Sequence, residues 1–263
     1  MMSEKGSARD TGVVERVISE VNATNPVLVC GLPGSGYVGK LAADHLVGLF
    51  DAKEVAEYTC DSFPPQVNVK DDGTVEPIKG HVFFALVGKE KSVLVFTADA
   101  QPTTSEGEYE LSDAVVRYAK RNGVKEVYTL AAYITGSFSA EPKVYGAATS
   151  QRLLDAVSSN GATLMKGGGI SGMNGLMIGV ASLRGLEGAC LLGETSGYLV
   201  DAAASKSVLE VLSKLVDIPI DTEKLKEKAE ETQKVINQLQ GMSEEAREAA
   251  TQPRRETRPG YIS

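Results

Sequence analysis

The stretch from residue 27 to residue 49 joins three local patterns that together restrict the fold. Its first four residues, Val27 to Cys30, form a short apolar run of the kind found in buried strands. The glycine-rich segment GLPGSGYVG (31–39) follows, and residues 38–49 then carry apolar side chains at helical spacing. A buried strand, a tight glycine turn and an amphipathic helix in this order are typical of an α/β protein.

The rest of the chain continues this alternation of strand and helix patterns. A second glycine-rich region, GGGISGMNGLMIGVAS (167–182), leads into a predicted helix. We therefore expect a three-layer α/β domain over residues 12–218. The other predicted strands span 13–21, 55–59, 67–69, 82–87, 92–98, 126–132 and 189–192, and the other predicted helices span 111–122, 150–159 and 202–216.

Three segments lie outside this domain. Residues 1–11 are polar and are predicted to form a loose tail, and residues 243–263 are polar and charged and are predicted to form a flexible C-terminal tail. Between the domain and that tail, residues 219–242 are predicted to form an amphipathic helix. Its apolar stripe either packs on its own domain or pairs with another subunit. The stripe consists of Leu225, Ala229, Thr232, Ile236 and Leu239.

Composition excludes several classes of function. The net charge of −8, from 27 basic and 35 acidic residues, argues against nucleic-acid binding, which needs a basic face. No run of 18 apolar residues predicts a membrane span, and the polar first ten residues predict no secretion signal, so we expect a cytoplasmic protein. The three dispersed cysteines suggest buried, reduced thiols, and two histidines are too few for a three-histidine metal site. We expect neither a metal nor a cofactor.

The first glycine-rich turn contains two nucleotide-binding patterns in incomplete form. Gly34, Gly36 and Gly39 spell G-x-G-x-x-G, and the stretch from Gly34 to Lys40 resembles a P-loop. A P-loop needs a hydroxyl after its lysine to hold Mg²⁺, and position 41 is leucine. The turn therefore either packs a helix tightly on the sheet or binds an anion through residues of this segment. The anion-binding residues would be Gly34, Ser35, Gly36, Gly39 and Lys40.

Three further polar residues follow predicted strands, where α/β folds place their sites. Gln101 and Glu106 come after the strand at 92–98, and Glu194 follows the strand at 189–192. They are candidate cleft residues, and the carboxylates could act in acid–base chemistry. Alternatively, they cap a helix or bind backbone N–H groups. Because no Ser–His–Asp arrangement is readable and His45 lies on an apolar helix face, we assign no catalytic residue.

Five segments taken together resemble a known family, the archaeal branch of the proteasome assembly chaperone 2 family. This resemblance covers about residues 12–240. It implies a fold like that of nucleoside phosphorylases, with a mixed central sheet and helices on both faces. It also implies homo-oligomers and a role in assembling proteasome α-subunits. The segments are NPVLVCGLPGSGYVGKLAADHL (25–46), DAQP (99–102), GEYELSDAVVRYAKRNGVKEVYTLAA (107–132), GGGISGMNGLMIGVAS (167–182) and LLGETSGY (191–198).

The resemblance also points to the C-terminus as a partner-binding segment. Family members that act on the proteasome often end in a hydrophobic residue, tyrosine and any residue, and the terminal carboxylate pairs with a lysine between α-subunits. This chain ends in Tyr261, Ile262 and Ser263, with Gly260 before the tyrosine. The tyrosine is thus third from the end, and the carboxylate lies about 3.3–3.6 Å of extended chain further away.

The sequence therefore favours a non-catalytic, proteasome assembly chaperone-like protein that homo-oligomerises. Its expected partners are proteasome α-subunits or a related assembly chaperone. The alternative is a phosphorylase- or ligase-type enzyme that binds an anionic small molecule at the glycine-rich turn.

Overall fold

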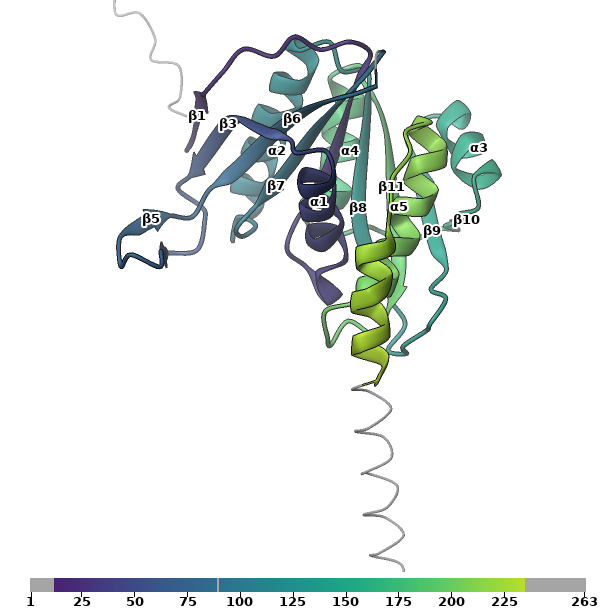
Figure 1. The fold of residues 1–263 in the computed structure, drawn as a ribbon. Coiled ribbons are helices and arrows are strands. Elements are labelled where there is room, and N and C mark those ends of the chain that lie inside the picture. The colour runs from purple at the N-terminus through teal and green to yellow at the C-terminus, as the bar shows by residue number, and fades with distance from the viewer. Residues whose placement is uncertain (1–11, 89, 235–263) are drawn as a thin grey trace, which may run out of the picture.

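The computed structural model describes residues 12–88 and 90–234, which form a mixed nine-stranded sheet with helices on both faces (Figure 1). This architecture confirms the predicted three-layer α/β/α fold with a mixed central sheet. The strands are β1 (Val13–Val17), β2 (Pro26–Gly31), β3 (Lys53–Cys60), β4 (Val67–Val69), β5 (Val75–Pro77), β6 (Gly80–Val87), β7 (Lys91–Ala98), β8 (Glu126–Ile134), β9 (Val144–Ala148), β10 (Thr163–Leu164) and β11 (Glu187–Thr195). The helices are η1 (Ser35–Tyr37), α1 (Val38–Leu49), α2 (Ser105–Arg121), α3 (Gln151–Ser159), α4 (Gly172–Leu183) and α5 (Ala202–Val216).

The sheet order β1-β3-β6-β7-β2-β8-β11-β9-β10 places four parallel strands at its centre. Strand β2 pairs in parallel with β7 and β8, and β8 pairs in parallel with β11. The strands β1, β3 and β6 extend the sheet in antiparallel pairing on one side, and β9 pairs antiparallel with β11 on the other. The carboxyl ends of the four parallel strands therefore meet at one edge, where α/β proteins commonly bind ligands.

Helices cover the two faces of the sheet in two groups. Helices α2 and α4 pack on one face through buried residues such as Leu111 and Met177. Helices α1, α3 and α5 pack on the other face, where Leu46 and Val208 are buried. The central strands are covered on both sides, which explains why β2 and β7 read as continuous apolar runs. Strands β4 and β5 form a separate hairpin that projects from the domain (Figure 1).

The chain is helical again over residues 223–234, and this helix lies on α1 and α5. Leu225 is only 1% exposed and belongs to the same apolar core as α1 and α5. Nε2 of His45 in α1 lies 2.6 Å from the carbonyl oxygen of Asp221. The described part of the predicted stripe thus faces the chain's own domain, whereas Ile236 and Leu239 lie outside the described residues.

Several boundaries differ from the sequence-based expectation. The helix predicted over 111–122 begins at Ser105, because the Thr104 hydroxyl caps it by accepting the Gly107 N–H at 3.1 Å. The first strand ends at Val17 rather than at residue 21. The strands β5, β9 and β10 were not predicted. Across residues 12–88 and 90–234, no helix is long and apolar enough to cross a membrane.

Candidate functional site

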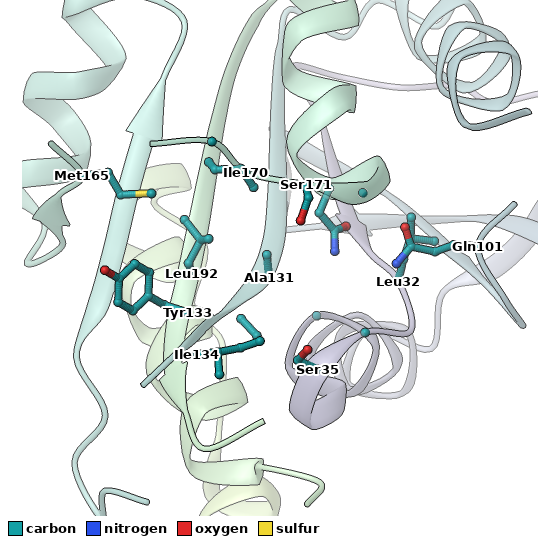
Figure 2. A pocket seen from close by; sticks show the side chains of 16 residues that line it. Leu32, Ser35, Gln101, Ala131, Tyr133, Ile134, Met165, Ile170, Ser171 and Leu192 are labelled. Atoms are coloured by element: carbon teal, nitrogen blue, oxygen red, sulfur yellow. The ribbon is translucent and has the colours of Figure 1, made fainter. Parts of the chain in front are cut away.

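A pocket of about 380 Å³ opens at the carboxyl edge of the parallel strands (Figure 2). It lies between the turn that follows β2, the end of β8, and the segment that leads into α4. Its lining is apolar on one side and carries hydroxyl and amide groups on the other. The described lining residues are Leu32, Gly34, Ser35, Gly39, Gln101, Ala131, Ala132, Tyr133, Ile134, Met165, Gly169, Ile170, Ser171, Gly172, Asn174 and Leu192.

Two glycines of the segment 31–39 allow β2, α1 and β8 to pack with their backbones in close contact near this pocket. A Cβ atom on Gly39 would lie 2.1 Å from the carbonyl oxygen of Leu130 in β8. A Cβ atom on Gly31 would lie 2.0 Å from the carbonyl oxygen of Gly39. Real Cβ atoms do not approach oxygen this closely, so only glycine fits at either position. These contacts agree with the interpretation of the segment as a tight turn that packs α1 on the sheet.

Gly34 differs from these two glycines because no packing contact requires it. Its φ of −174° is an extended conformation that any residue can adopt. A Cβ atom there would meet nothing closer than Nε2 of Gln101, at 3.9 Å. A side chain at this position would instead extend toward the pocket that Gly34 lines.

Gln101 connects the two glycine-rich segments across the pocket. Its Nε2 donates a hydrogen bond to the carbonyl oxygen of Pro33 at 2.6 Å, and its Oε1 accepts the Met173 N–H at 3.0 Å. The side chain therefore fixes the turn after β2 against the first turn of α4. Gln101 is a positioning residue for the pocket wall.

Only some of the residues singled out in the sequence meet at this pocket. Gly34, Ser35, Gly39 and Gln101 line it together, whereas Gly36 is buried with a φ of +62° and is not among the lining residues. The C-terminal residues Tyr261, Ile262 and Ser263 lie outside the described residues.

The charged residues that the sequence suggested for the site lie outside the pocket lining. The ammonium group of Lys40 pairs with the Asp44 carboxylate at 2.6 Å on the surface of α1. Glu106 is exposed in the first turn of α2. Oε2 of Glu194 accepts the backbone N–H of Lys143 at 3.2 Å, just before β9. None of these three side chains lines the pocket.

Sequence reasoning missed Asn174, which is 8% exposed and lines the pocket from α4. Its Oδ1 is buried without a hydrogen-bond partner among the described residues. A single asparagine within an otherwise apolar helix pattern was the signal that could have identified it, because buried polar side chains are uncommon.

The three cysteines are buried thiols outside the pocket lining. Burial raises the pKa of Cys190 to about 12 and also raises the pKa values of Cys30 and Cys60. At neutral pH these thiols are therefore protonated and poorly nucleophilic. Within the described ranges, no cluster of three His, Cys, Asp or Glu side chains could hold a metal ion.

Exposed apolar side chains gather around the same edge of the sheet as the pocket. Two backbone hydrogen bonds hold the loops that carry them together: Thr135 N–H to the Thr195 carbonyl at 2.9 Å, and Asp201 N–H to the Gly36 carbonyl at 2.8 Å. Contiguous exposed apolar surface commonly marks a protein–protein contact. We call this region the carboxyl-end apolar surface, and it consists of Tyr37, Ile134, Tyr198, Leu199 and Val200.

Comparison with known proteins identifies a matching family and two relatives from one organism. A family model described as the PAC2 family matches residues 28–240. An uncharacterised protein of Methanocaldococcus jannaschii is 38% identical over 240 residues, which cover 90% of this chain and 92% of the relative. A second uncharacterised protein of that organism is 23% identical over 244 residues, covering 93% of this chain and 96% of the relative.

Solved structures of Pyrococcus furiosus proteins share the fold. PbaB, described as an archaeal proteasome activator, is 31% identical with a TM-score of 0.82, and the match covers 88% of this chain and 99% of PbaB. PbaA, described as an archaeal homologue of proteasome-assembly chaperone, is 28% identical with a TM-score of 0.73, and the match covers 91% of this chain and 96% of PbaA.

Proposed function

Because the chain belongs to the PAC2 family, we propose that it is a cytoplasmic, non-catalytic assembly factor that homo-oligomerises and binds proteasome α-subunits or a related assembly chaperone. The family match confirms the resemblance predicted from the sequence. The observation that carries the proposal is the likeness to PbaB over nearly the full length of both proteins. Both Pyrococcus relatives are described in terms of the proteasome, which supports a proteasome-related partner.

The surroundings of the polar residues support a binding role over catalysis. Both polar atoms of the Gln101 side-chain amide form hydrogen bonds with backbone groups. Lys40 forms an ion pair with Asp44 outside the pocket lining. Glu194 accepts a backbone N–H. Each of these groups thus has a structural partner, and a reaction would first have to separate it from that partner.

The helix over residues 223–234 runs toward the carboxyl edge of the sheet. It starts beside His45, in the C-terminal half of α1, and its later residues Ala229 and Gln233 lie beside Ala203 and Lys206 at the start of α5. The start of α5 follows the loop that carries Tyr198. The proposed partner contact therefore uses the C-terminal segment, and the neighbouring carboxyl-end apolar surface is proposed as the contact between copies of the chain.

Deleting residues 241–263 should strongly reduce co-purification of proteasome α-subunits with the tagged chain, because the tail supplies the docking end group. Within the full chain, Tyr261→Ala should reduce it as well, since the tyrosine anchors the terminus. Thr251→Ala alters the same tail without touching the end group and should leave co-purification unchanged. If neither the full chain nor the deletion captures α-subunits, the proposed partner is wrong.

Leu199→Asp should shift the chain to a smaller species in sedimentation-velocity experiments. Leu199 is 45% exposed, and a charge there would have to be buried if the carboxyl-end apolar surface forms the contact between copies. Leu86→Asp is the matched control, because Leu86 is also an exposed leucine but pairs with Ser92 at the opposite edge of the sheet. Equal masses for both variants and the unmodified chain would exclude this surface as the self-association site.

A further inference from the structure

The hairpin of β4 and β5 exposes its apolar face to solvent and turns its polar face toward the domain. Val67, Val69 and Val75 are 53%, 70% and 60% exposed, and we call them the valine face. Val69 lies opposite Val75, and side chains two residues apart share a face, so the three lie together. The other face carries Asn68 and Glu76, which are half-buried. Surface strands normally show the reverse arrangement, so the valine face indicates a protein–protein contact.

Hydrogen bonds fix this hairpin at the same edge of the sheet as the carboxyl-end apolar surface. Nδ2 of Asn68 donates a hydrogen bond to Oδ2 of Asp99 at 3.0 Å, and the Lys79 N–H donates to the same oxygen at 3.0 Å. Asp99 directly follows β7, which pairs in parallel with β2, so it lies at the carboxyl edge. From there the hairpin projects on the side of the sheet away from α3 (Figure 1). The domain therefore holds the hairpin through its polar face and leaves the valine face uncovered.

A hollow of about 480 Å³ lies at the base of the hairpin and continues the valine face. Val67 and Pro77, which lie opposite each other in the hairpin, form part of its lining. The segment before β4 contributes Phe63, Pro64 and Pro65. Walls of this composition suit an aromatic ring, which buries a large apolar area. The hollow and the valine face together fit an aromatic side chain that has apolar neighbours.

The carboxyl-end apolar surface provides side chains of this kind. Tyr198 is 84% exposed, and Leu199 and Val200 follow it in the same loop. These side chains and the valine face are all exposed in the single chain, so they do not cover each other within it. Two copies of the chain would bring them together.

Charges at the margins of the two surfaces are complementary. The turn of the hairpin carries Asp71 and Asp72, both of them exposed. Lys143 is exposed and is held beside Glu194, near the end of β11 and before the loop of Tyr198. Its carbonyl oxygen accepts the Glu194 N–H at 2.8 Å, and its own N–H donates to the Glu194 carboxylate at 3.2 Å. Opposite charges at the rim of an apolar contact favour one orientation of the two surfaces.

We propose that Tyr198 of one copy inserts into the hollow at the hairpin of a second copy, with Leu199 and Val200 against the valine face. This contact rests on the self-association proposed above, because it names the surface that the carboxyl-end apolar surface meets. Since the two surfaces differ, the copies join head to tail, and such contacts form a ring when their rotation closes.

Sedimentation velocity of the full chain tests the hairpin side of this contact. Val69→Asp should weaken self-association at least about tenfold, because its charge would be buried without a partner. Val69→Ile keeps an apolar, β-branched side chain and should self-associate like the unmodified chain. Val14→Asp is the control for added charge, since Val14 is 64% exposed but lies in β1, the outermost strand of the sheet. It should leave self-association unchanged.

A second pair of variants tests the insertion of the ring. Tyr198→Ala should weaken self-association because the hollow loses its occupant, whereas Tyr198→Phe keeps the ring and should retain it. Equal self-association of the alanine variant and the unmodified chain would show that Tyr198 does not fill the hollow and would overturn the proposal.

A mixture of two variants separates this contact from the self-association on which it rests. Leu199→Asp keeps an intact hairpin, and Val69→Asp keeps an intact carboxyl-end apolar surface, so an equal mixture should form pairs with one copy of each. A tag on one variant captures these pairs, and circular dichroism checks that both variants are folded. If no mixed pair forms, or if Val69→Asp keeps the mass of the unmodified chain while Leu199→Asp does not, the hairpin contact alone is wrong. If Leu199→Asp also keeps that mass, or if the unmodified chain sediments as a single copy, the self-association proposed above is wrong as well.

Discussion

Gly39→Ala is expected to lower the free energy of unfolding by about 3 kcal/mol, because it overpacks a site where backbone touches backbone. The new methyl group would lie 2.1 Å from the carbonyl oxygen of Leu130 and 3.0 Å from its carbonyl carbon. Leu130 pairs with Gly31 in the central β2–β8 ladder, so it cannot withdraw without disturbing the sheet. Helix α1 would have to move away from both strands instead.

Urea and thermal unfolding of the full chain measure this loss. The melting temperature should fall by about 6–12 °C, since about 1 kcal/mol corresponds to about 2–4 °C in a domain of this size. Gly48→Ala is the matched control in the same helix, because a Cβ atom there meets nothing within 4 Å. That substitution should be neutral or stabilising by up to about 1 kcal/mol. A loss below about 1 kcal/mol in Gly39→Ala would show that α1 does not need this close approach.

The sequence pattern alone predicted the bounds of helices whose caps and buried stripe lie within or directly beside their own residues. The helix predicted over 202–216 coincides with α5, because a buried stripe lies between the Asp201 cap and the left-handed Asp217. The helix predicted over 38–49 likewise coincides with α1. Strand β9 was missed because its sequence, VYGAA, has little apolar patterning, and its pairing with β11 fixes it instead. Such pairing joins distant parts of the chain and leaves no local signal.

The site was predictable only in part for a similar reason. The position of Gln101 after a strand indicated the correct edge of the sheet, and the glycine turn indicated the correct end of β2. Glu194 was predicted to follow a strand that ends at residue 192, but β11 continues to Thr195, and the Glu194 carboxylate accepts the backbone N–H of Lys143 just before β9. Asn174 and Gly34 line the same pocket because α4 packs beside the turn after β2. The spacing of residues along the sequence does not reveal this packing.

Asp201→Ala should have the second large effect, a loss of about 3 kcal/mol in the free energy of unfolding. The carboxylate is 4% exposed, accepts the Ala204 N–H at 2.9 Å as the N-cap of α5, and accepts the Thr195 hydroxyl at 2.7 Å. Alanine removes the cap, worth about 1 kcal/mol, and leaves a buried hydroxyl without an acceptor, at about 1–3 kcal/mol. Chemical denaturation compared with Asp201→Asn measures the effect.

Asp201→Asn separates these two contributions and connects them to the proposed contact between copies of the chain. Asparagine is a good N-cap residue, so this variant should keep the bond to Ala204 and lose only about 1 kcal/mol. In Asp201→Ala, the loop with Tyr198 should also lose protection from amide hydrogen exchange, because Asp201 and Thr195 together hold both of its ends. If the alanine and asparagine variants unfold at the same denaturant concentration, the N-cap bond to Ala204 contributes little. If Asp201→Ala leaves the hydrogen exchange of the loop unchanged, the loop that carries the carboxyl-end apolar surface is held by its backbone alone.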